Sequence, residues 1–205
     1  FVNDAFSCSH RAHASVSKIA EFLPSFAGLQ LETEINALKK VTIEIKKPIA
    51  CIIGGSKIST KIKIIKNLIP KFNYIIIVGG MANNVLHYLG NPIGKSIKEN
   101  NCDSIIDDIF KTAKNHSCEI VYPEDVVIGK SMEDNAEIKE LKCVENDDFI
   151  LDIGPKTINK IKDIFETAKN YSCKIVYPED IVVGKNMEDK AKIKELNEVK
   201  SNDFI

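Results

Sequence analysis

Two short apolar segments that each end in a pair of glycines constrain the fold of this 205-residue chain most strongly. Residues 48–53 and 74–78 are apolar and strand-sized, and they are followed by Gly54-Gly55 and Gly79-Gly80. Between them, apolar side chains recur at a helical spacing over residues 57–69. A strand that is apolar throughout is buried on both faces, which is typical of a parallel sheet covered by helices. This region therefore predicts a strand–helix–strand unit of an α/β protein.

The same alternation continues further along the chain. Residues 104–115 place apolar side chains on one helical face, and residues 119–122 form a third apolar strand before Pro123. Residues 149–153 form a fourth strand, which Gly154-Pro155 stops, and a helix near residues 31–40 precedes the sheet. We therefore predict an α/β fold of the Rossmann-like, three-layer αβα type with a mostly parallel, doubly wound sheet.

A long internal repeat occupies the end of the chain. Residues 163–205 align with residues 108–150 at a constant offset, and about 30 of the 43 positions are identical. A solenoid needs three or more stacked units and shows looser identity between them, so two near-identical copies indicate a recent genetic duplication. We therefore expect an incomplete α/β domain plus a duplicated helix–strand unit.

Both ends of the printed sequence carry expectations. The chain starts at Phe1 without a methionine, and the second copy stops at residue 205, where the first copy continues through Gly154-Pro155. We expect an upstream segment to be missing and the second copy to stop partway into a strand. The strand expected at 174–177 would either fill a vacant sheet position or leave an apolar edge exposed.

Composition limits the partners of the chain. Its 28 basic and 29 acidic side chains give a net charge of −1, so no overall field favours nucleic acid or an anionic membrane. No stretch approaches the roughly 20 apolar residues of a membrane-spanning helix. Six cysteines occur without a CxxC pair, and we interpret them as reduced, mostly buried thiols of a cytoplasmic protein; a disulfide or metal framework is the weaker alternative.

The segment from Gly54 to Lys61 is the first candidate site. It follows a predicted strand and opens a predicted helix, where ligands of α/β sheets bind. The glycines permit a tight turn, and Lys57 and Lys61, four positions apart, would project on one side of the helix. Their charge suits a bound phosphate, since a helix N-terminus disfavours cations when it is empty. The alternative is a solvated lysine face, and the order of a Walker loop is absent.

Two further segments are weaker candidates. The run from Gly79 to Asn83 repeats the strand–glycine–helix arrangement and could form a second wall of the same cleft, or could be purely structural. His10, Arg11 and His13 gather positive or titratable groups, and an arginine binds carboxylate or phosphate through a bidentate fork. The alternative is a surface loop. We expect no metal site there, because no Cys, Asp or Glu stands at ligand spacing.

Several of these segments together resemble phosphoglycerate kinases. The resemblance runs in order from residue 1 to about 161 and rests on Val2 to His13, residues 23–38, Gly54 to Lys61, Gly79 to Asn83, Gly94 to Ser96 and Leu151 to Pro155. Enzymes of this family have two Rossmann-like domains, of which the N-terminal one binds phosphoglycerate and the C-terminal one binds Mg-nucleotide.

The resemblance implies roles by position. Arg11 would contact the acidic substrate, with His10 and His13 adding positive potential nearby. Lys61 would contact the nucleotide phosphates with Lys57 beside it, and the glycines lining the nucleotide site would be Gly54, Gly55, Gly79, Gly80 and Gly154. The reaction implied is glycolytic phosphoryl transfer between 1,3-bisphosphoglycerate and ADP, giving 3-phosphoglycerate and ATP, with Mg²⁺ carried by the nucleotide. Such chemistry rests on positioning and charge neutralisation.

The departures from the family pattern limit this implication. The N-terminal domain with its Asp-x-Asn motif does not occur in the printed sequence, nor do the later Gly-Pro-x-Gly-x-Phe-Glu and Gly-Gly-Gly-Asp-Ser/Thr motifs. We therefore expect a chain that is inactive alone. We also expect it to be a monomer. The alternatives are a non-catalytic remnant, or a nucleotide-binding or interaction module, from a partial or decayed gene.

The sequence also predicts a division into three parts. Residues 1–30 would form a substrate-side segment that leads in from another domain. Residues 31–157 would form a partial nucleotide-binding α/β domain, and residues 158–205 would be a near-copy of residues 103–150.

Overall fold

A computed structural model describes residues 1–131, 136–170, 180–183 and 192–195. The chain divides into two compact units, Phe1–Ile164 and Phe165–Ile205, which are described separately below. The three-part division expected from the sequence stays a prediction.

A parallel sheet forms the centre of the first unit. Its strand order is β3-β4-β5, and the strands are Ala50–Ile53, Tyr74–Ile77 and Glu119–Val121. The middle strand is paired on both edges, with Cys51 opposite Ile75 and Ile75 opposite Ile120. Its three isoleucines are at most 1% exposed, as expected for a strand covered on both faces. The three predicted parallel strands are thereby confirmed.

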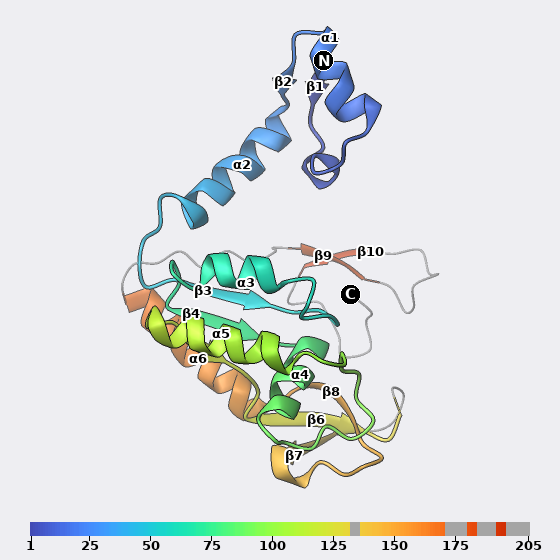
Figure 1. The fold of residues 1–205 in the computed structure, drawn as a ribbon, viewed down its shortest axis with the longest axis vertical. Coiled ribbons are helices and arrows are strands. Elements are labelled where there is room, and N and C mark those ends of the chain that lie inside the picture. Colours follow the sequence, from blue (N-terminus) through green and yellow to red (C-terminus); the bar gives the residue numbers. More distant parts are fainter. Residues whose placement is uncertain (132–135, 171–179, 184–191, 196–205) are drawn as a thin grey trace. The chain divides into compact units, whose positions relative to one another are not determined.

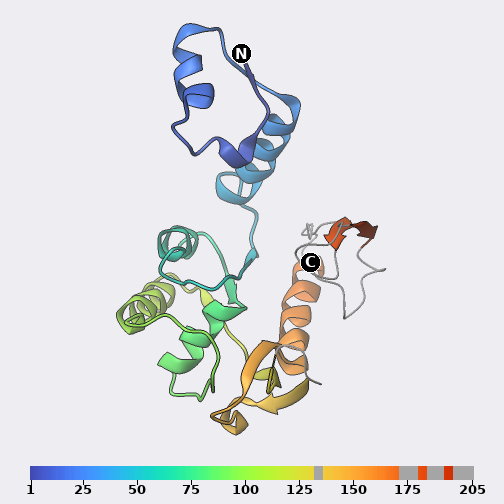
Figure 2. The ribbon, with the colours of Figure 1, turned by 90° about the vertical axis from the view of Figure 1, so that its right-hand side faces the viewer.

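Three helices follow the strands of this sheet, namely α3 Ile62–Leu68, α4 Gly80–Tyr88 and α5 Asp103–Asn115. Ile106, Ile109 and Ala113 lie on one face of α5 and are buried against residues of α3 and the sheet. Figure 1 shows α3 and α5 beside the parallel sheet, and Figure 2 shows them on one side of it with α6 (Pro155–Asn170) on the other. This helical covering gives the chain its α/β character.

The helix predicted over residues 57–69 begins later than expected, at Ile62. Residues 58–61 form turns instead. Ile58 is fully buried in the core, so its apolar side chain satisfies the helical pattern without belonging to the helix. The expected start was therefore wrong by about one turn.

A second sheet is antiparallel, with strand order β7-β6-β8. Its strands are β6 Asp125–Gly129, β7 Glu137–Glu140 and β8 Phe149–Ile153. The strand predicted at 149–153 therefore exists, but its expected place in the parallel sheet was wrong. It pairs antiparallel with β6, and Phe149 also bridges to Gly94. Long-range pairing decides this position, and apolar character alone does not encode it.

A buried carboxylate joins this second sheet to α6. Asp125 is 2% exposed and accepts hydrogen bonds from the Lys156 and Thr157 amides, both at 2.9 Å, and from the Thr157 hydroxyl at 2.8 Å. These amides lie in the first turn of α6, so Asp125, at the start of β6, caps the helix. Gly154 leaves room for this, because a Cβ atom there would collide with the carboxylate.

In the N-terminal segment, too, a carboxylate from a distant part of the chain accepts a hydrogen bond from an amide at a helix start. Strands β1 Val2–Asn3 and β2 Phe26–Ala27 pair in parallel, and short helical turns and α1 Ile19–Phe22 lie between them. Helix α2, Leu29–Thr42, contains the helix expected near residues 31–40. Its Leu31 amide donates to Asp4 Oδ1 at 2.9 Å, and Gly28 leaves space for that carboxylate.

The second unit contains an antiparallel pair of strands, β9 Asp180–Val183 and β10 Lys192–Glu195. Asp180 lies opposite Glu195 here, just as Asp125 lies opposite Glu140 in the antiparallel β7-β6-β8 sheet of the first unit, and the other pairs correspond in the same way. The two hairpins thus have the same register. The strand expected at 174–177 lies outside the described residues.

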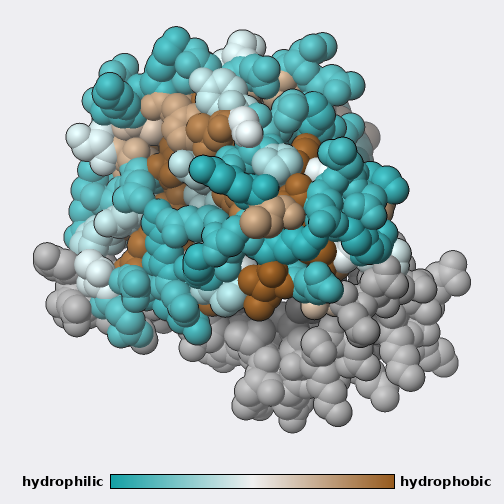
Figure 3. Space-filling model, turned by 90° about the horizontal axis from the view of Figure 1, so that it is seen from below, coloured by the Kyte–Doolittle hydropathy of each residue, from teal (hydrophilic) through white to brown (hydrophobic). Residues whose placement is uncertain are grey.

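The surface and the thiols complete the fold. No helix in the described ranges is long and apolar enough to cross a membrane. The coloured face in Figure 3 is mainly hydrophilic, with hydrophobic side chains in small separate groups. All five cysteines of the described part are free: two are buried, two are half-buried and Cys143 is exposed. Burial raises the pKa of Cys118 to about 11, which makes this thiol unreactive near neutral pH. Cys173 lies outside the described residues.

We expect Asp125→Ala to destabilise the first unit by about 1–3 kcal/mol, because the α6 amides lose their acceptors inside the protein. The measurement is the free energy of unfolding from urea titration. Asp152→Ala is the control, since Asp152 is exposed on β8 and its side chain accepts a hydrogen bond from the adjacent Ile153 amide, its one bond within the described ranges. Equal losses in the two variants would contradict the capping role.

Candidate functional site

The loop from Gly54 to Lys61, called the lysine loop below, connects β3 to α3. Ile58 anchors its middle in the core, while Lys57 and Lys61 on either side are exposed. The Lys61 amide donates to the Ile58 carbonyl at 3.0 Å and the Thr60 hydroxyl to the Lys57 carbonyl at 2.9 Å. Neither lysine ammonium group has an ion-pair or hydrogen-bond partner in the described part of the chain.

The two lysines do not lie on one helix, as the sequence led us to expect. Lys61 is the residue before the first turn of α3, and Lys57 lies in the irregular segment ahead of it. The positive charge of this loop comes from the lysine side chains.

The two glycine turns lie in direct contact. The Met81 amide donates to the Gly55 carbonyl at 2.7 Å, and a Cβ atom at Gly80 would lie 3.3 Å from Ser56 Cα. Gly55 and Gly79 have φ values of +135° and +64°, which residues other than glycine rarely adopt. The expected proximity of Gly54-Gly55 and Gly79-Gly80 is thus observed.

A segment that sequence reasoning did not single out as a site braces the lysine loop. Residues 94–99, called the 94–99 strap, begin at β8, where the Lys95 amide donates to the Asp148 carbonyl and the Ile150 amide donates to Ser96 Oγ, both at 2.8 Å. The strap ends at Glu99, which bonds Ser59 in the lysine loop. It therefore connects the second sheet to the candidate site.

Buried asparagines of α4 hold the strap in place. Asn84 Oδ1 accepts the Glu99 amide at 2.7 Å, and Asn83 Nδ2 donates to the Ile97 carbonyl at 3.1 Å. Asn83 Oδ1 is buried and has no hydrogen-bond partner among the described residues. One feature of the sequence could have indicated this contact: Asn83 and Asn84 stand among apolar residues of α4. Polar side chains at buried positions need hydrogen-bond partners, so the two asparagines predict a bonded segment nearby.

The remaining predicted residues lie elsewhere in the chain. His10, Arg11 and His13 are exposed in the N-terminal segment, and the Arg11 amide bonds the Cys8 carbonyl at 3.0 Å. Their side chains have no ion-pair partners in the described part of the chain. Gly154 lies at the turn from β8 to α6, where it accommodates Asp125. Its implied contact with nucleotide stays a prediction.

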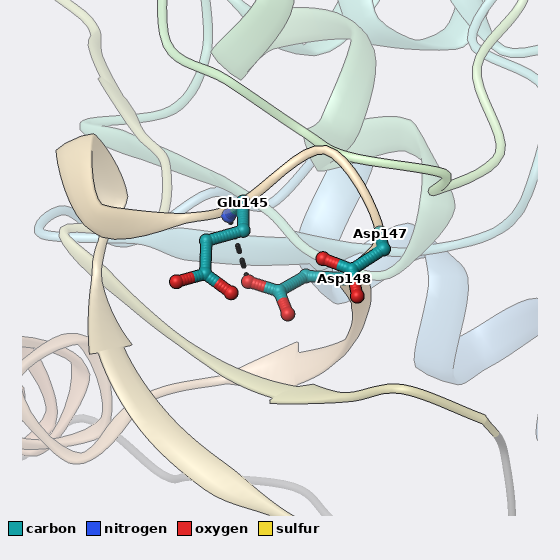
Figure 4. A group of neighbouring side chains, drawn as sticks. All are labelled: Glu145, Asp147 and Asp148. Atoms are coloured by element: carbon teal, nitrogen blue, oxygen red, sulfur yellow. Dashed lines mark hydrogen bonds between the residues drawn. The ribbon is translucent and has the colours of Figure 1, made fainter.

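One acidic group could be mistaken for a metal site. Glu145, Asp147 and Asp148 each bring a carboxylate oxygen within 4.8 Å of the others, and Figure 4 shows the three side chains converging. Lys130 Nζ lies 2.7–2.9 Å from all three carboxylates, and Lys139 Nζ lies 3.0 Å from Asp148. The two ammonium groups offset two of the three negative charges, so we interpret the cluster as an ion-pair network of the second sheet.

Asp148 is the buried centre of this network. Burial alone would raise the pKa of its carboxyl group, but hydrogen bonds from Lys130, the Glu145 amide and Lys139 outweigh that effect and hold the pKa below its usual range. The hydrogen bond with Asp148 is the largest of the effects that raise the pKa of Lys130. The charged form of Asp148 is therefore the one that the fold stabilises.

Stability should consequently fall in acid. Because the folded pKa of Asp148 lies below the unfolded value of about 3.9, its contribution is present above that pH and is lost as the pH falls below it. We expect Asp148→Asn to cost about 1–3 kcal/mol at pH 7 and to flatten the decline of stability between about pH 5 and pH 2. Urea unfolding across this range measures both effects. The exposed neighbour Asp147, changed to Asn, should alter the profile little; an unchanged profile in Asp148→Asn would contradict the assignment.

Comparison with known proteins gives a consistent result. The model of the family "Phosphoglycerate kinase" matches residues 1–170. Over 170 residues the chain is 45% identical to the phosphoglycerate kinase of Wolbachia pipientis wMel, which covers 82% of this chain and 43% of that protein. Over 171 residues it is 40% identical to the enzyme of Xanthobacter flavus, again covering 82% and 43%. The chain thus spans less than half the length of these relatives.

Solved structures agree with the sequence comparison. The phosphoglycerate kinase of Coxiella burnetii superimposes with a TM-score of 0.73 and 34% identity, covering 80% of this chain and 44% of that one. The enzyme of Pyrococcus horikoshii OT3 gives a TM-score of 0.66 at 23% identity, which shows a shared fold. With the family model matching most of its residues, this chain belongs to the phosphoglycerate kinase family.

Proposed function

We propose that the lysine loop binds the phosphates of ADP or ATP. The observation that carries the proposal is the pair of exposed ammonium groups of Lys57 and Lys61, which have no partner among the residues that the structure describes and stand on a loop whose middle is buried. A fixed loop lowers the entropy cost of binding, and the lysines supply the charge that a polyphosphate needs. The positive-φ glycines at Gly55 and Gly79, together with Gly54 and Gly80, support a close approach of backbone to the ligand.

Mg²⁺ would enter with the nucleotide. Among the described residues, Glu99 is the acidic side chain that bonds the lysine loop, and both of its oxygens accept hydrogen bonds from Ser59. The loop therefore offers ammonium groups, which suit phosphate, and no spare carboxylate for a resident cation. The metal would neutralise phosphate charge, while this chain's own residues bind and orient the phosphates.

The acidic substrate is proposed to bind at the N-terminal segment. Arg11, with His10 and His13, presents exposed groups that suit the carboxylate or phosphate of 3-phosphoglycerate. With ADP at the lysine loop, the reaction proposed for the whole protein is transfer of the 1-phosphoryl group of 1,3-bisphosphoglycerate to ADP. This transfer yields 3-phosphoglycerate and ATP.

The polypeptide of residues 1–205, taken alone, is proposed to bind nucleotide without completing this reaction. Two observations support this: the chain spans 43% of the length of its relatives, and the Gly-Gly-Gly-Asp-Ser/Thr and Gly-Pro-x-Gly-x-Phe-Glu motifs do not occur in its sequence. We further propose a monomeric cytoplasmic protein in three parts, with residues 158–205 derived from residues 103–150 by gene duplication. The shared register of the two hairpins supports this origin.

Isothermal titration with ADP tests the nucleotide site. We expect Lys61→Ala to weaken ADP binding about 5- to 20-fold, because one charge-assisted contact to phosphate is lost. Lys63→Ala is the matched control, since Lys63 is an exposed lysine of the adjacent α3 and changes the net charge equally. Equal weakening in both variants would mean that overall charge, and no specific site, attracts the nucleotide.

A coupled assay tests the proposed lack of turnover. The purified 205-residue chain, given 1,3-bisphosphoglycerate and Mg-ADP, is expected to form no ATP above a control without protein. A full-length phosphoglycerate kinase in the same assay shows that the reagents work. Turnover by the chain that disappears in Lys61→Ala would overturn this part of the proposal.

A further inference from the structure

We infer that Glu99 positions the lysine loop for nucleotide phosphates, an inference that rests on the proposed function. Glu99 reaches the loop from 40 positions further along the chain. Its Oε2 accepts the Ser59 amide at 2.9 Å and its Oε1 accepts the Ser59 hydroxyl at 2.6 Å. Ser59 lies midway between Lys57 and Lys61, so fixing its backbone fixes the origin of both lysine side chains.

Glu99 is itself held by helix α4. Its amide donates to Asn84 Oδ1 at 2.7 Å, and Asn84 Nδ2 donates to the Gly80 carbonyl at 3.2 Å. Asn84 is 2% exposed, so this link is shielded from water. A continuous series of hydrogen bonds therefore runs from Gly80, in the second glycine turn, through Asn84 and Glu99 to Ser59 in the lysine loop. The two halves of the candidate nucleotide site are connected through a side chain that belongs to neither.

The negative charge of Glu99 and its hydrogen bonds to Ser59 have opposite expected effects on phosphate binding. A carboxylate beside a phosphate-binding loop opposes anion binding on Coulomb grounds. Both of its oxygens bond Ser59, and among the described residues neither Lys57 nor Lys61 forms an ion pair with it. The hydrogen bonds from Ser59 hold the pKa of Glu99 below its usual range, so it is ionised near neutral pH. Its contribution must come from the position it imposes on the loop.

Two substitutions at Glu99 distinguish these roles in ADP titrations of the full 205-residue chain. Glu99→Gln removes the charge but keeps an acceptor for the Ser59 amide and a donor to the Ser59 hydroxyl. We expect it to bind ADP as tightly as the native chain or more tightly. Glu99→Ala removes charge and hydrogen bonds together, and we expect it to weaken ADP binding about 5- to 20-fold through loss of preorganisation. Glu137→Ala is the control for the loss of one negative charge, because Glu137 is exposed on β7.

The two roles predict changes of opposite sign in the ADP affinity of Glu99→Ala. Weaker binding in Glu99→Ala with native binding in Glu99→Gln supports positioning. Tighter binding in both variants would show that Glu99 acts only through its charge, and native affinity in Glu99→Ala would show that the bonds to Ser59 are dispensable; either result overturns the inference. Ser59→Ala, which keeps the amide bond and loses only the hydroxyl, should weaken binding less than Glu99→Ala and in the same direction.

Hydrogen exchange without nucleotide gives an independent readout. The Lys61 amide bonds the Ile58 carbonyl at 3.0 Å, within the turn that Ser59 belongs to. Glu99→Ala should speed exchange at Lys61 at least about 5-fold while amides of α5 stay protected, since a local release leaves the core intact. Unchanged exchange at Lys61, or equal acceleration in α5, overturns the inference. A native chain that does not bind ADP would contradict the proposed function, and the exchange measurement would still decide the role of Glu99.

Discussion

The pairing of the central strand β4 on both edges is the constraint on which the sheet and the candidate site depend. Its three isoleucines alternate between two covered faces, so a shift by one residue would move every side chain to the wrong face. Fixed register also places the ends of β3 and β4 side by side, where the Val78 amide bonds the Ile53 carbonyl at 3.0 Å. The contact between the glycine turns follows from that register, and the lysine loop is built on the contact.

Outside the sheet, the chain relies on carboxylates that act at a distance in sequence. Asp4 accepts an amide at the start of α2, Asp125 does so at the start of α6, and Glu99 does so at Ser59. In the first two cases a glycine, Gly28 or Gly154, leaves the space that the carboxylate fills. Backbone amides at helix starts and turns lack local partners, so an acidic side chain from another element satisfies them and fixes the two elements together.

The sequence predicts those features that local patterns determine. Apolar runs give the strands at Ala50–Ile53, Tyr74–Ile77 and Phe149–Ile153, and paired glycines give the turns that follow the first two. The start of α3 could not be predicted, because a buried Ile58 satisfies the helical spacing from within a turn. The antiparallel place of β8 and the bond from Glu99 to Ser59 depend on partners far along the chain. No local periodicity encodes such partners, and only the folded arrangement reveals them.

The matching registers of the two hairpins carry a consequence for how such a chain can change over generations. Two of the four cross-strand pairs differ in sequence between the two hairpins, yet the strands align in the same way. The register of such a hairpin therefore tolerates substitution at half of its cross-strand pairs. A copying error that repeats such a stretch adds a ready-made piece of ordered backbone, and selection can then work on the new piece without first having to invent a fold for it.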